Sequence, residues 1–521
     1  MDSSRSFRNI IDRCLAGQAD IKVIGSLNNG EKALEFLMRQ KPDLVTLDVE
    51  MPVMDGIQTL RVIQIINRER PEHERIGCIM VSASTKRGAS ITLKCLENGA
   101  FDFITKPGGD SSSAEENFQE LKNQLLPKIR AYAQKYVFPK KPRSLIEEGE
   151  KKLLTREVGQ EKIKVLIVDD SRIFRNIVEK TISQHPDIQV IGSVWNGVKA
   201  LEFIMKERPH VVSLDLEMPE MDGLETLRVI QIINRTQSDQ IPIGIIMVSA
   251  YTSKGAEVTL ECLEGGAFDF VPKVEQNKSR EENFAHLKEQ LLPKILAYAK
   301  KHVYRERRFQ RVVGLPRIIP VRPGGLRVRA LFIGVSTGGP KALMTLMPQL
   351  SVILKMPIFI VQHMPPNFTE SLANSLDGVC SGHKVIEAPH MKEVVNDCIY
   401  IAPGGVHLKV QKGAGSRIVT AHGHGPRDSG CKPSVNELFK SGVKVYGSGM
   451  LAIILTGMGR DGSDSLPLLK KRGVRVLVQD EESSVVWGMP GSALSTGLVD
   501  EVLPLDKIPE RLKALIGNTI K

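Results

Sequence analysis

Residues 211–223 read Val-Val-Ser-Leu-Asp-Leu-Glu-Met-Pro-Glu-Met-Asp-Gly, and residues 44–56 read Leu-Val-Thr-Leu-Asp-Val-Glu-Met-Pro-Val-Met-Asp-Gly. The two stretches lie 167 residues apart, and the run Arg-Val-Ile-Gln-Ile-Ile-Asn-Arg at 61–68 returns at 228–235 with the same spacing. A repeat of this length indicates a duplicated domain rather than a solenoid unit.

Each copy alternates short apolar runs with amphipathic stretches, such as 164–168, then 174–182, then 188–191. This alternation predicts a parallel sheet with helices on both faces. A third module, from about Val328, alternates in the same way but shares no motif with the copies. We therefore predict an α/β protein with three doubly wound domains, of which the last is of a different kind.

The composition of the 521 residues, 41% hydrophobic and 25% charged, is typical of globular domains. No apolar run reaches the ~18 residues of a membrane span and no secretory signal is recognisable, so we expect a cytoplasmic protein without membrane insertion. Seven cysteines without any CxxC pair argue against a disulfide framework or a zinc site.

The net charge of +11 is not gathered on one predicted helix, so we expect no nucleic-acid partner. The exception is the stretch 305–329, which combines eight arginines with prolines and glycines. This composition predicts a basic, extended tether.

Carboxylates follow two strands of the second copy, Asp169 and Asp170 after 164–168 and Asp215 after 211–214. Functional side chains of doubly wound sheets gather at the carboxyl ends of strands. Three carboxylates brought together there would repel one another without a hard cation, and Mg²⁺ fits best. Asp215 could then attack an incoming phosphoryl group.

Ser249 and Lys273 follow two further predicted strands, where their side chains would hold phosphoryl oxygens. With these residues, the segment from 163 to about 290 resembles a response-regulator receiver domain, which is flavodoxin-like. The resemblance implies phosphorylation of Asp215 by a sensor histidine kinase, with Mg²⁺ in the pocket. The implied metal ligands are Asp169, Asp170, Asp215 and the backbone carbonyl of Glu217.

The first copy keeps the phosphoacceptor position as Asp48 and the lysine as Lys106. The counterpart of the strand at 164–168 is missing, and Ser3 stands in place of the second carboxylate. Both losses should weaken the sheet and the metal site. We expect a degenerate or truncated receiver rather than an active phosphorylation site at Asp48.

The third module begins with a predicted strand at 329–335 and a helix at 340–347, joined by Gly-Val-Ser-Thr-Gly-Gly at 334–339. Such a glycine-rich turn exposes Ser336 near the positive end of the helix, as a nucleophile requires. A phosphate-binding loop is the alternative, but the Walker lysine and the Gly-x-Gly-x-x-Gly pattern are absent.

His363 follows a predicted strand at 356–361, and Asp461 lies in the glycine-rich loop after a strand at 451–455. His363 would act as general base toward Ser336, and Asp461 would orient the imidazole and stabilise its charged form. Three such residues at three strand ends of one domain predict a hydrolase with a Ser-His-Asp triad.

Five motifs in this order resemble the catalytic domain of the chemotaxis protein-glutamate methylesterases, the CheB family. They are Gly-Val-Ser-Thr-Gly-Gly339, Gln-His-Met-Pro-Pro366, Ile-Ala-Pro-Gly-Gly405, Leu-Thr-Gly-Met-Gly-Arg-Asp-Gly462 and the run from Gln479-Asp-Glu to Gly488-Met-Pro490. The resemblance implies that glutamate methyl esters on methyl-accepting chemoreceptors are hydrolysed with release of methanol. It leaves deamidation of receptor glutamines open as a second activity.

The resemblance also implies roles for Thr337 and for the backbone N–H of Met458, beside the substrate oxyanion. It implies no cofactor for the hydrolase, and an unphosphorylated receiver that covers the cleft. Cys431-Lys-Pro-Ser-Val-Asn436 departs from the family's Arg-rich lead into Pro-Ser-Val. His422-Gly-His424 is interpreted as a flexible, glycine-rich insertion.

These observations predict five segments along the chain. They are an incomplete receiver-like domain at 1–138, a linker at 139–162, a receiver at 163–300, a basic Pro/Gly/Arg linker at 301–327 and a methylesterase domain at 328–521. A phosphorylation-gated docking protein with a weak or idle hydrolase is the alternative. A transcription factor is disfavoured because no helix-turn-helix is apparent, and an open, shallow cleft would argue against a small-molecule esterase.

Overall fold

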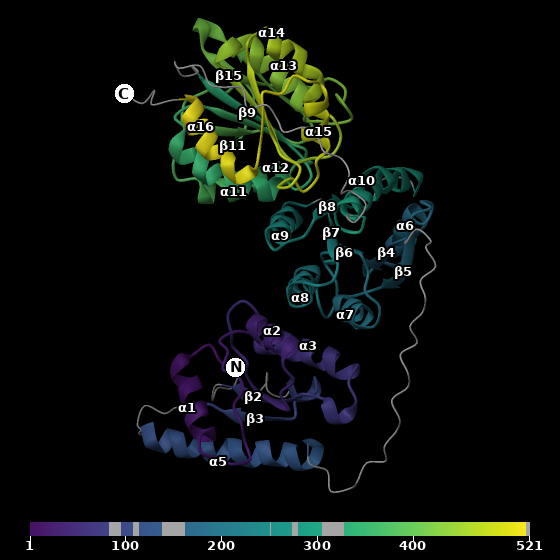
Figure 1. The fold of residues 1–521 in the computed structure, drawn as a ribbon, viewed down its shortest axis with the longest axis vertical. Coiled ribbons are helices and arrows are strands. Elements are labelled where there is room, and N and C mark those ends of the chain that lie inside the picture. The colour runs from purple at the N-terminus through teal and green to yellow at the C-terminus, as the bar shows by residue number, and fades with distance from the viewer. Residues whose placement is uncertain are drawn as a thin grey trace. The chain divides into compact units, whose positions relative to one another are not determined.

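The computed structural model describes residues 1–82, 95–107, 114–137, 162–250, 252–273, 280–304 and 328–516. These residues form three main sheets and one two-stranded ribbon (Figure 1). Most of the arginine-rich stretch, 305–327, lies outside the described residues. In the described part of the chain, no helix combines the length and the apolar character that a membrane crossing requires.

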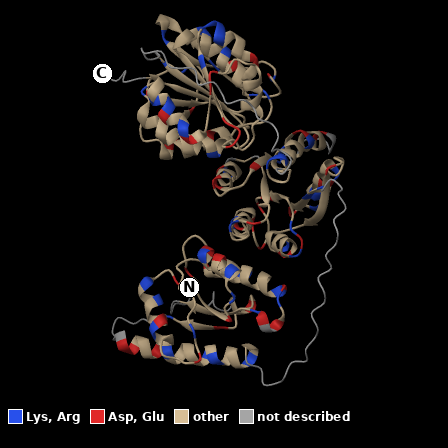
Figure 2. Cartoon of the chain, viewed as in Figure 1, with Lys and Arg blue, Asp and Glu red and all other residues tan. Residues whose placement is uncertain are grey.

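Basic and acidic residues are interspersed along the helices (Figure 2). Blue and red segments alternate along α5 (Ala114–Tyr132), which carries Glu115, Glu116 and Arg130. The net charge of +11 is therefore not concentrated on this long helix.

The first receiver copy contains a sheet of three parallel strands in the order β1-β2-β3. The strands are β1 (Leu44–Asp48), β2 (Gly77–Ser82) and β3 (Asp102–Thr105). The helices are α1 (Arg5–Leu15), α2 (Gly30–Arg39), α3 (Gly56–Arg68) and α5, which continues into a π-helical turn, η2 (Ala133–Val137). Helices α1 and α5 pack against β2 and β3 through side chains that include Phe7, Ile79 and Leu121.

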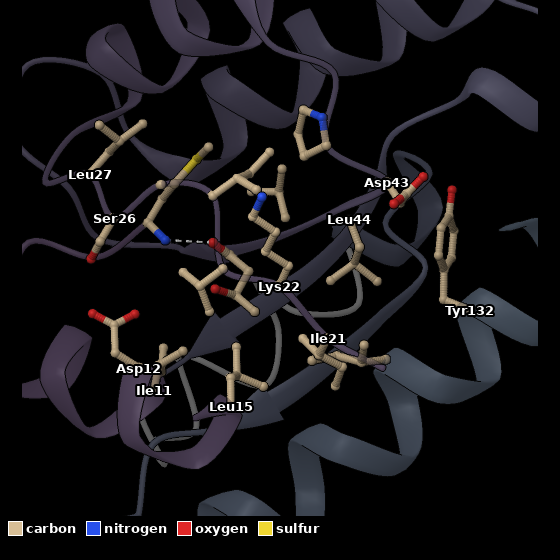
Figure 3. Close-up of a pocket in the computed structure, with 18 of the residues that line it drawn as sticks. Ile11, Asp12, Leu15, Ile21, Lys22, Ser26, Leu27, Asp43, Leu44 and Tyr132 are labelled. Atoms are coloured by element: carbon tan, nitrogen blue, oxygen red, sulfur yellow. Dashed lines mark hydrogen bonds between the residues drawn. The ribbon is translucent and has the colours of Figure 1, made fainter. Parts of the chain in front are cut away.

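A groove of about 440 Å³ lies beside β1 (Figure 3). Its lining includes Ile11, Ile21 and Leu44. The segment 21–27 on the groove is not a strand, although its sequence repeats that of a strand in the second copy.

The second receiver copy contains five strands in the order β5-β4-β6-β7-β8. They are β4 (Ile163–Val168), β5 (Ile188–Val194), β6 (Val211–Asp215), β7 (Gly244–Ser249) and β8 (Asp269–Pro272). The helices are α6 (Arg172–Ile182), α7 (Gly197–Lys206), α8 (Gly223–Thr236), α9 (Ser253–Glu264) and α10 (Arg280–His302). This alternation confirms the predicted doubly wound fold and brings the ends of β4, β6, β7 and β8 to one edge.

The third module contains a seven-stranded sheet in the order β11-β12-β10-β9-β15-β16-β17, with every pair parallel. The strands are β9 (Ala330–Val335), β10 (Ile358–Gln362), β11 (Lys384–Glu387), β12 (Cys398–Ile401), β15 (Met450–Ile454), β16 (Arg475–Gln479) and β17 (Glu501–Leu503). The helices are α11 (Gly339–Ile353), α12 (Phe368–Val379), α13 (Val435–Tyr446), α14 (Leu466–Lys471), α15 (Gly488–Ser495) and α16 (Ile508–Ile516).

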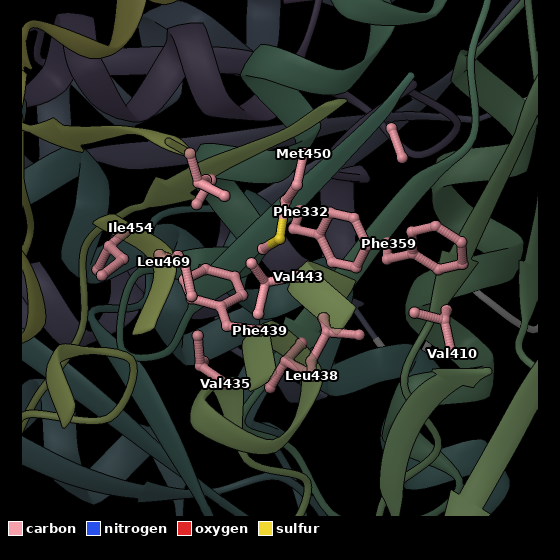
Figure 4. Packing of buried hydrophobic residues seen from close by; sticks show 14 of the residues in the cluster. Phe332, Phe359, Val410, Val435, Leu438, Phe439, Val443, Met450, Ile454 and Leu469 are labelled. Carbon is pink, nitrogen blue, oxygen red and sulfur yellow. The ribbon is translucent and has the colours of Figure 1, made fainter. Parts of the chain in front are cut away.

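The core of this module lies between the sheet and helix α13 (Figure 4). Phe332 and Phe359 stack with ring centroids 4.9 Å apart, and Phe439 from α13 belongs to the same cluster. All three rings are fully buried. Burial of such a ring stabilises the fold by about 2–3 kcal/mol, so α13 is fixed firmly on the sheet.

The interpretation of His422 as part of a flexible insertion is wrong. The residue lies in β14 (Ile418–Gly423), which pairs antiparallel with β13 (His407–Lys412). The imidazole Nε2 of His422 lies 2.8 Å from the backbone oxygen of Ala388. The glycine content alone indicated a loop, but residues 418–423 pair with 407–412 at six successive positions and so form a strand.

Candidate active site

Three neighbouring strands of the seven-stranded sheet lead to Ser336, His363 and Asp461. The central strand β9 ends just before Ser336, and its two neighbours β10 and β15 lead to His363 and to the loop with Asp461. The strand ends remain paired, because the backbone N–H of His363 donates to Val335 O at 3.1 Å and that of Ser336 donates to Thr456 O at 3.0 Å. The parallel register therefore brings the three residues to one edge of the sheet.

The turn that carries Ser336 is built tightly. Gly338 has a φ of 76°, in the left-handed region that favours glycine, and a Cβ there would lie 2.4 Å from Val485. A Cβ on Gly457, from the Asp461 loop, would lie 2.7 Å from Cβ of Ser336. Among the described residues, the Ser336 hydroxyl makes no hydrogen bond, so it is available to a substrate.

The imidazole of His363 is held by Asp461, whose Oδ2 lies 2.9 Å from Nε2. The Asp461 side chain is 2% exposed and that of His363 is 12% exposed. Burial favours the neutral ring, but the hydrogen bonds to Asp461 and Cys431 outweigh it and raise the pKa of His363. Burial would likewise raise the pKa of Asp461, but His363 and backbone N–H groups outweigh it and lower that pKa.

The side chain of Asp461, from the loop after β15, lies against the N-terminus of α13. The sequence interpretation missed this contact. Oδ1 accepts from the Ser434 hydroxyl and from the N–H of Asn436, both at 3.0 Å. Oδ2 accepts from the N–H of Val435 at 2.7 Å. The unpaired amides and the dipole of a helix N-terminus favour a negative charge, so this position keeps Asp461 ionised. The Pro-Ser-Val-Asn run signals the start of this helix, because Ser434 caps it, but it does not indicate that the helix N-terminus binds Asp461.

Thr337 and Met458 line the same cleft as Ser336, His363 and Asp461. Within the described residues, the backbone N–H groups of Thr337 and Met458 donate no hydrogen bond. Two such donors near a serine hydroxyl are the elements of an oxyanion hole.

The second receiver copy brings together the three carboxylates expected at its strand ends. Oxygen atoms of Asp169, Asp170 and Asp215 all lie within 4.8 Å of one another. Lys273 Nζ lies 2.7 Å from Asp215 Oδ2. Ser249, which is buried, is the last residue of the neighbouring strand β7. The Glu217 carbonyl expected as a further metal ligand follows Asp215 by two residues. Oxygen donors in this number and at this spacing suit Mg²⁺.

The first receiver copy has a different pocket. Lys106 Nζ lies 2.8 Å from a carboxylate oxygen of Asp2 and 2.8 Å from one of Asp48. The Ser3 hydroxyl donates at 3.3 Å to the backbone oxygen of Glu50, the counterpart of the carbonyl expected to bind metal in the second copy. Burial and the charge of Asp2 raise the pKa of Asp48, although Lys106 opposes them. The first copy thus has one carboxylate fewer than the second, and the backbone oxygen of Glu50 already accepts a hydrogen bond from Ser3.

Residues 331–512 match the CheB methylesterase family, and residues 1–115 and 165–282 match the response regulator receiver domain family. A protein-glutamate methylesterase/protein-glutamine glutaminase of Pyrococcus horikoshii is 39% identical over 350 residues, which are 67% of this chain and 92% of that relative. The chain belongs to the CheB methylesterase family. A second relative of the same description, from a Nocardioides species, is 40% identical over 68% of this chain and 95% of its own length.

Among solved structures, the catalytic domain of the Thermotoga maritima CheB methylesterase is 39% identical and covers 36% of this chain and 99% of that domain, with a TM-score of 0.35. The two CheB-family relatives align with about two thirds of the chain. Both receiver copies nevertheless match the receiver family. The duplicated receiver is therefore a departure from these relatives.

Proposed function

We propose that this chain hydrolyses glutamate methyl esters on methyl-accepting chemoreceptors and releases methanol, under control of phosphorylation at Asp215. The observation that carries the proposal is the hydrogen-bonded pair of His363 and Asp461, which follow the two strands on either side of the strand that leads to Ser336. A docking protein with an idle hydrolase would have no need for an ionised carboxylate held by a helix N-terminus behind a histidine.

In the proposed reaction, the Ser336 hydroxyl attacks the ester carbonyl carbon while His363 accepts the hydroxyl proton. The N–H groups of Thr337 and Met458 stabilise the negative oxygen that forms. The C–O bond to the methoxy group then breaks, and His363 returns the proton so that methanol leaves. Water attacks the resulting acyl-serine in the same way, which yields the glutamate carboxylate and free Ser336.

The same steps apply to a glutamine side chain, where the C–N bond breaks and ammonia leaves. We propose this deamidation as a second activity, supported by the double description of the relatives. In the proposed reaction, the groups that act on the substrate and on the attacking water are side chains and backbone of this chain.

Activity is expected to increase with pH, because His363 accepts a proton only when its ring is neutral. The carboxylate of Asp461 raises the pKa of His363, so the half-maximal kcat/KM should lie above the ordinary histidine value of 6.5. A pH profile of methanol release tests this. Asp461→Asn should move the midpoint downward, whereas a midpoint at or below 6.5 in the unsubstituted chain would contradict the proposed base.

In the receiver, Asp215 is the proposed phosphoacceptor and a sensor histidine kinase the proposed donor. Asp169, Asp170 and Asp215, with the carbonyl of Glu217, would hold Mg²⁺. When bound, this ion supplies positive charge that offsets the charge of the phosphoryl oxygens. The ammonium of Lys273, 2.7 Å from Asp215, would form an ion pair with the phosphoryl group.

Asp215→Asn is expected to abolish stimulation of methanol release by a small phosphodonor without changing the basal rate. The matched variant is Asp48→Asn, at the equivalent position of the first copy. Because that pocket has lost a carboxylate and its carbonyl is engaged, stimulation should remain there. Phosphoryl incorporation and methanol release are measured together. Loss of stimulation in the Asp48 variant alone would assign control to the first copy instead.

A further inference from the structure

The thiol of Cys431 lies beside His363 and Asp461, although the proposed reaction does not use it. A ring nitrogen of His363, the sulfur of Cys431 and a carboxylate oxygen of Asp461 all lie within 4.8 Å of one another. Within the described residues, one other group of this kind is found, the three carboxylates of the second receiver. The thiol also forms a hydrogen bond with the imidazole of His363.

Cys431 is the accessible cysteine of the chain. All seven cysteines belong to the described residues, and the other six are buried, whereas Cys431 is half-buried. Cys431 lines the same cleft as Ser336, His363 and Asp461. A small cation that enters this cleft can therefore reach the thiol and both of its neighbours.

A tight turn fixes the position of Cys431. Its two central residues have positive φ values of 53° and 80°, and the flanking Asp428 and Cys431 exchange backbone hydrogen bonds of 3.2 and 2.9 Å. Ser429 in this turn accepts a hydrogen bond of 3.1 Å from the side chain of Asn436, at the start of α13. The same helix terminus holds Asp461, so one helix orders two of the three side chains. Side chains that are ordered in advance lose little entropy when they bind a ligand.

The three side chains together offer one nitrogen, one sulfur and one oxygen atom. Zinc sites use these ligand types, with bonds of about 2.0–2.2 Å to nitrogen or oxygen and about 2.3 Å to sulfur. Tetrahedral bonds of this length place the ligand atoms about 3.3–3.6 Å apart. The 2.9 Å between His363 Nε2 and Asp461 Oδ2 and the limit of 4.8 Å for the group lie on either side of this range. Small side-chain rotations are therefore sufficient to bring the three atoms around one ion.

Spacing along the chain does not reveal this group. The absence of a CxxC pair argued against a zinc site, but the three side chains stand at 363, 431 and 461, in separate segments. They meet because His363 and Asp461 follow strands on either side of β9, and because the turn with Cys431 is tied to α13.

We propose that His363, Cys431 and Asp461 bind a soft divalent cation such as Zn²⁺, and that the bound ion inhibits the hydrolase. The inhibition rests on the proposed function, whereas the binding of the metal does not. A neutral imidazole has one free lone pair, so a ring that donates it to a metal cannot accept the proton of Ser336. Mg²⁺ prefers ligand sets made of oxygen, so the ion expected in the receiver pocket would not act here.

Binding is tested with Co²⁺, which occupies tetrahedral zinc sites and reports its ligands by absorption. The full chain, reduced and free of other transition metals, is titrated with Co²⁺ in excess Mg²⁺. We expect a near-ultraviolet charge-transfer band from thiolate to cobalt, which added Zn²⁺ removes. Cys431→Ser should abolish this band, because the other six thiols are buried. Cys431→His should lose the band but keep the visible absorption of tetrahedral cobalt.

Inhibition is tested as the ratio of basal methanol release with and without Zn²⁺, so that a change in the basal rate of a variant cancels. Cys431→Ser should raise the half-inhibitory Zn²⁺ concentration by at least roughly 100-fold, because even the partners of metal ligands change affinity by about 10- to 100-fold. The control is His390→Gln, at an exposed histidine of the same module that lies beside His422. This variant should remain as sensitive to Zn²⁺ as the unsubstituted chain.

Three results would overturn the proposal. They are the absence of the thiolate band, equal inhibition of the unsubstituted chain and Cys431→Ser, and faster methanol release with Zn²⁺. If the chain releases no methanol even without metal, the proposed function fails, and the cobalt band still decides by itself whether the metal site exists.

Discussion

Ser336→Ala is expected to lower the rate of methanol release from methylated receptor by roughly 10⁴-fold or more, because no other group can form the acyl intermediate. The substitution removes one oxygen from a residue whose hydroxyl makes no hydrogen bond among the described residues, so folding should be unaffected. Methanol is measured from receptor membranes carrying labelled methyl groups.

The receiver supplies an internal control for that variant. Phosphoryl incorporation at Asp215 should be unchanged in Ser336→Ala, which separates loss of the nucleophile from loss of the fold. Ser463→Ala is a matched substitution at a buried serine beyond Gly462 and should retain most of the activity. Turnover that persists in Ser336→Ala would refute the assignment of the nucleophile.

Asp461→Asn is expected to lower kcat by about 10³- to 10⁴-fold and the free energy of unfolding by about 1–3 kcal/mol. The carboxylate accepts hydrogen bonds from Ser434, Val435, Asn436 and Gly462 in addition to His363. An asparagine places an NH₂ donor against some of these donors. The imidazolium that forms during catalysis also loses its counter-charge.

Asp464→Asn is the matched control for Asp461→Asn. Asp464 lies three residues further in the chain, but its side chain is 44% exposed and pairs with the exposed Arg460. Exposed pairs contribute little to stability, so activity and unfolding should change little. Urea unfolding and initial rates are measured on both variants. A fully active Asp461→Asn enzyme would exclude the proposed role of the carboxylate.

Local patterns were sufficient to predict the fold where strands are long and apolar. The run 211–214 was predicted as a strand and forms β6 with Asp215 at its end. The segment 21–27 has nearly the same sequence as β5 but forms no strand, because no strand of the described residues lies beside it in the way that β4 lies beside β5. Strand formation there depends on a distant segment, which local sequence does not report.

The sequence was sufficient to predict those residues of the candidate site that directly follow a strand. Ser336, His363 and Asp461 follow β9, β10 and β15, and glycine-rich turns mark two of these positions. The support of Asp461 by Ser434 and Asn436 was missed, because it depends on how α13 packs on the sheet. The cap at Ser434 predicts the start of a helix but does not indicate what its amides bind.

Reaction of the full chain with a serine-directed organophosphonate, followed by mass spectrometry, tests the central claim most directly. We predict one adduct, on Ser336, that forms in step with loss of methanol release and forms far more slowly in His363→Ala. An inactivated enzyme with the adduct on another residue and Ser336 unmodified would contradict the claim.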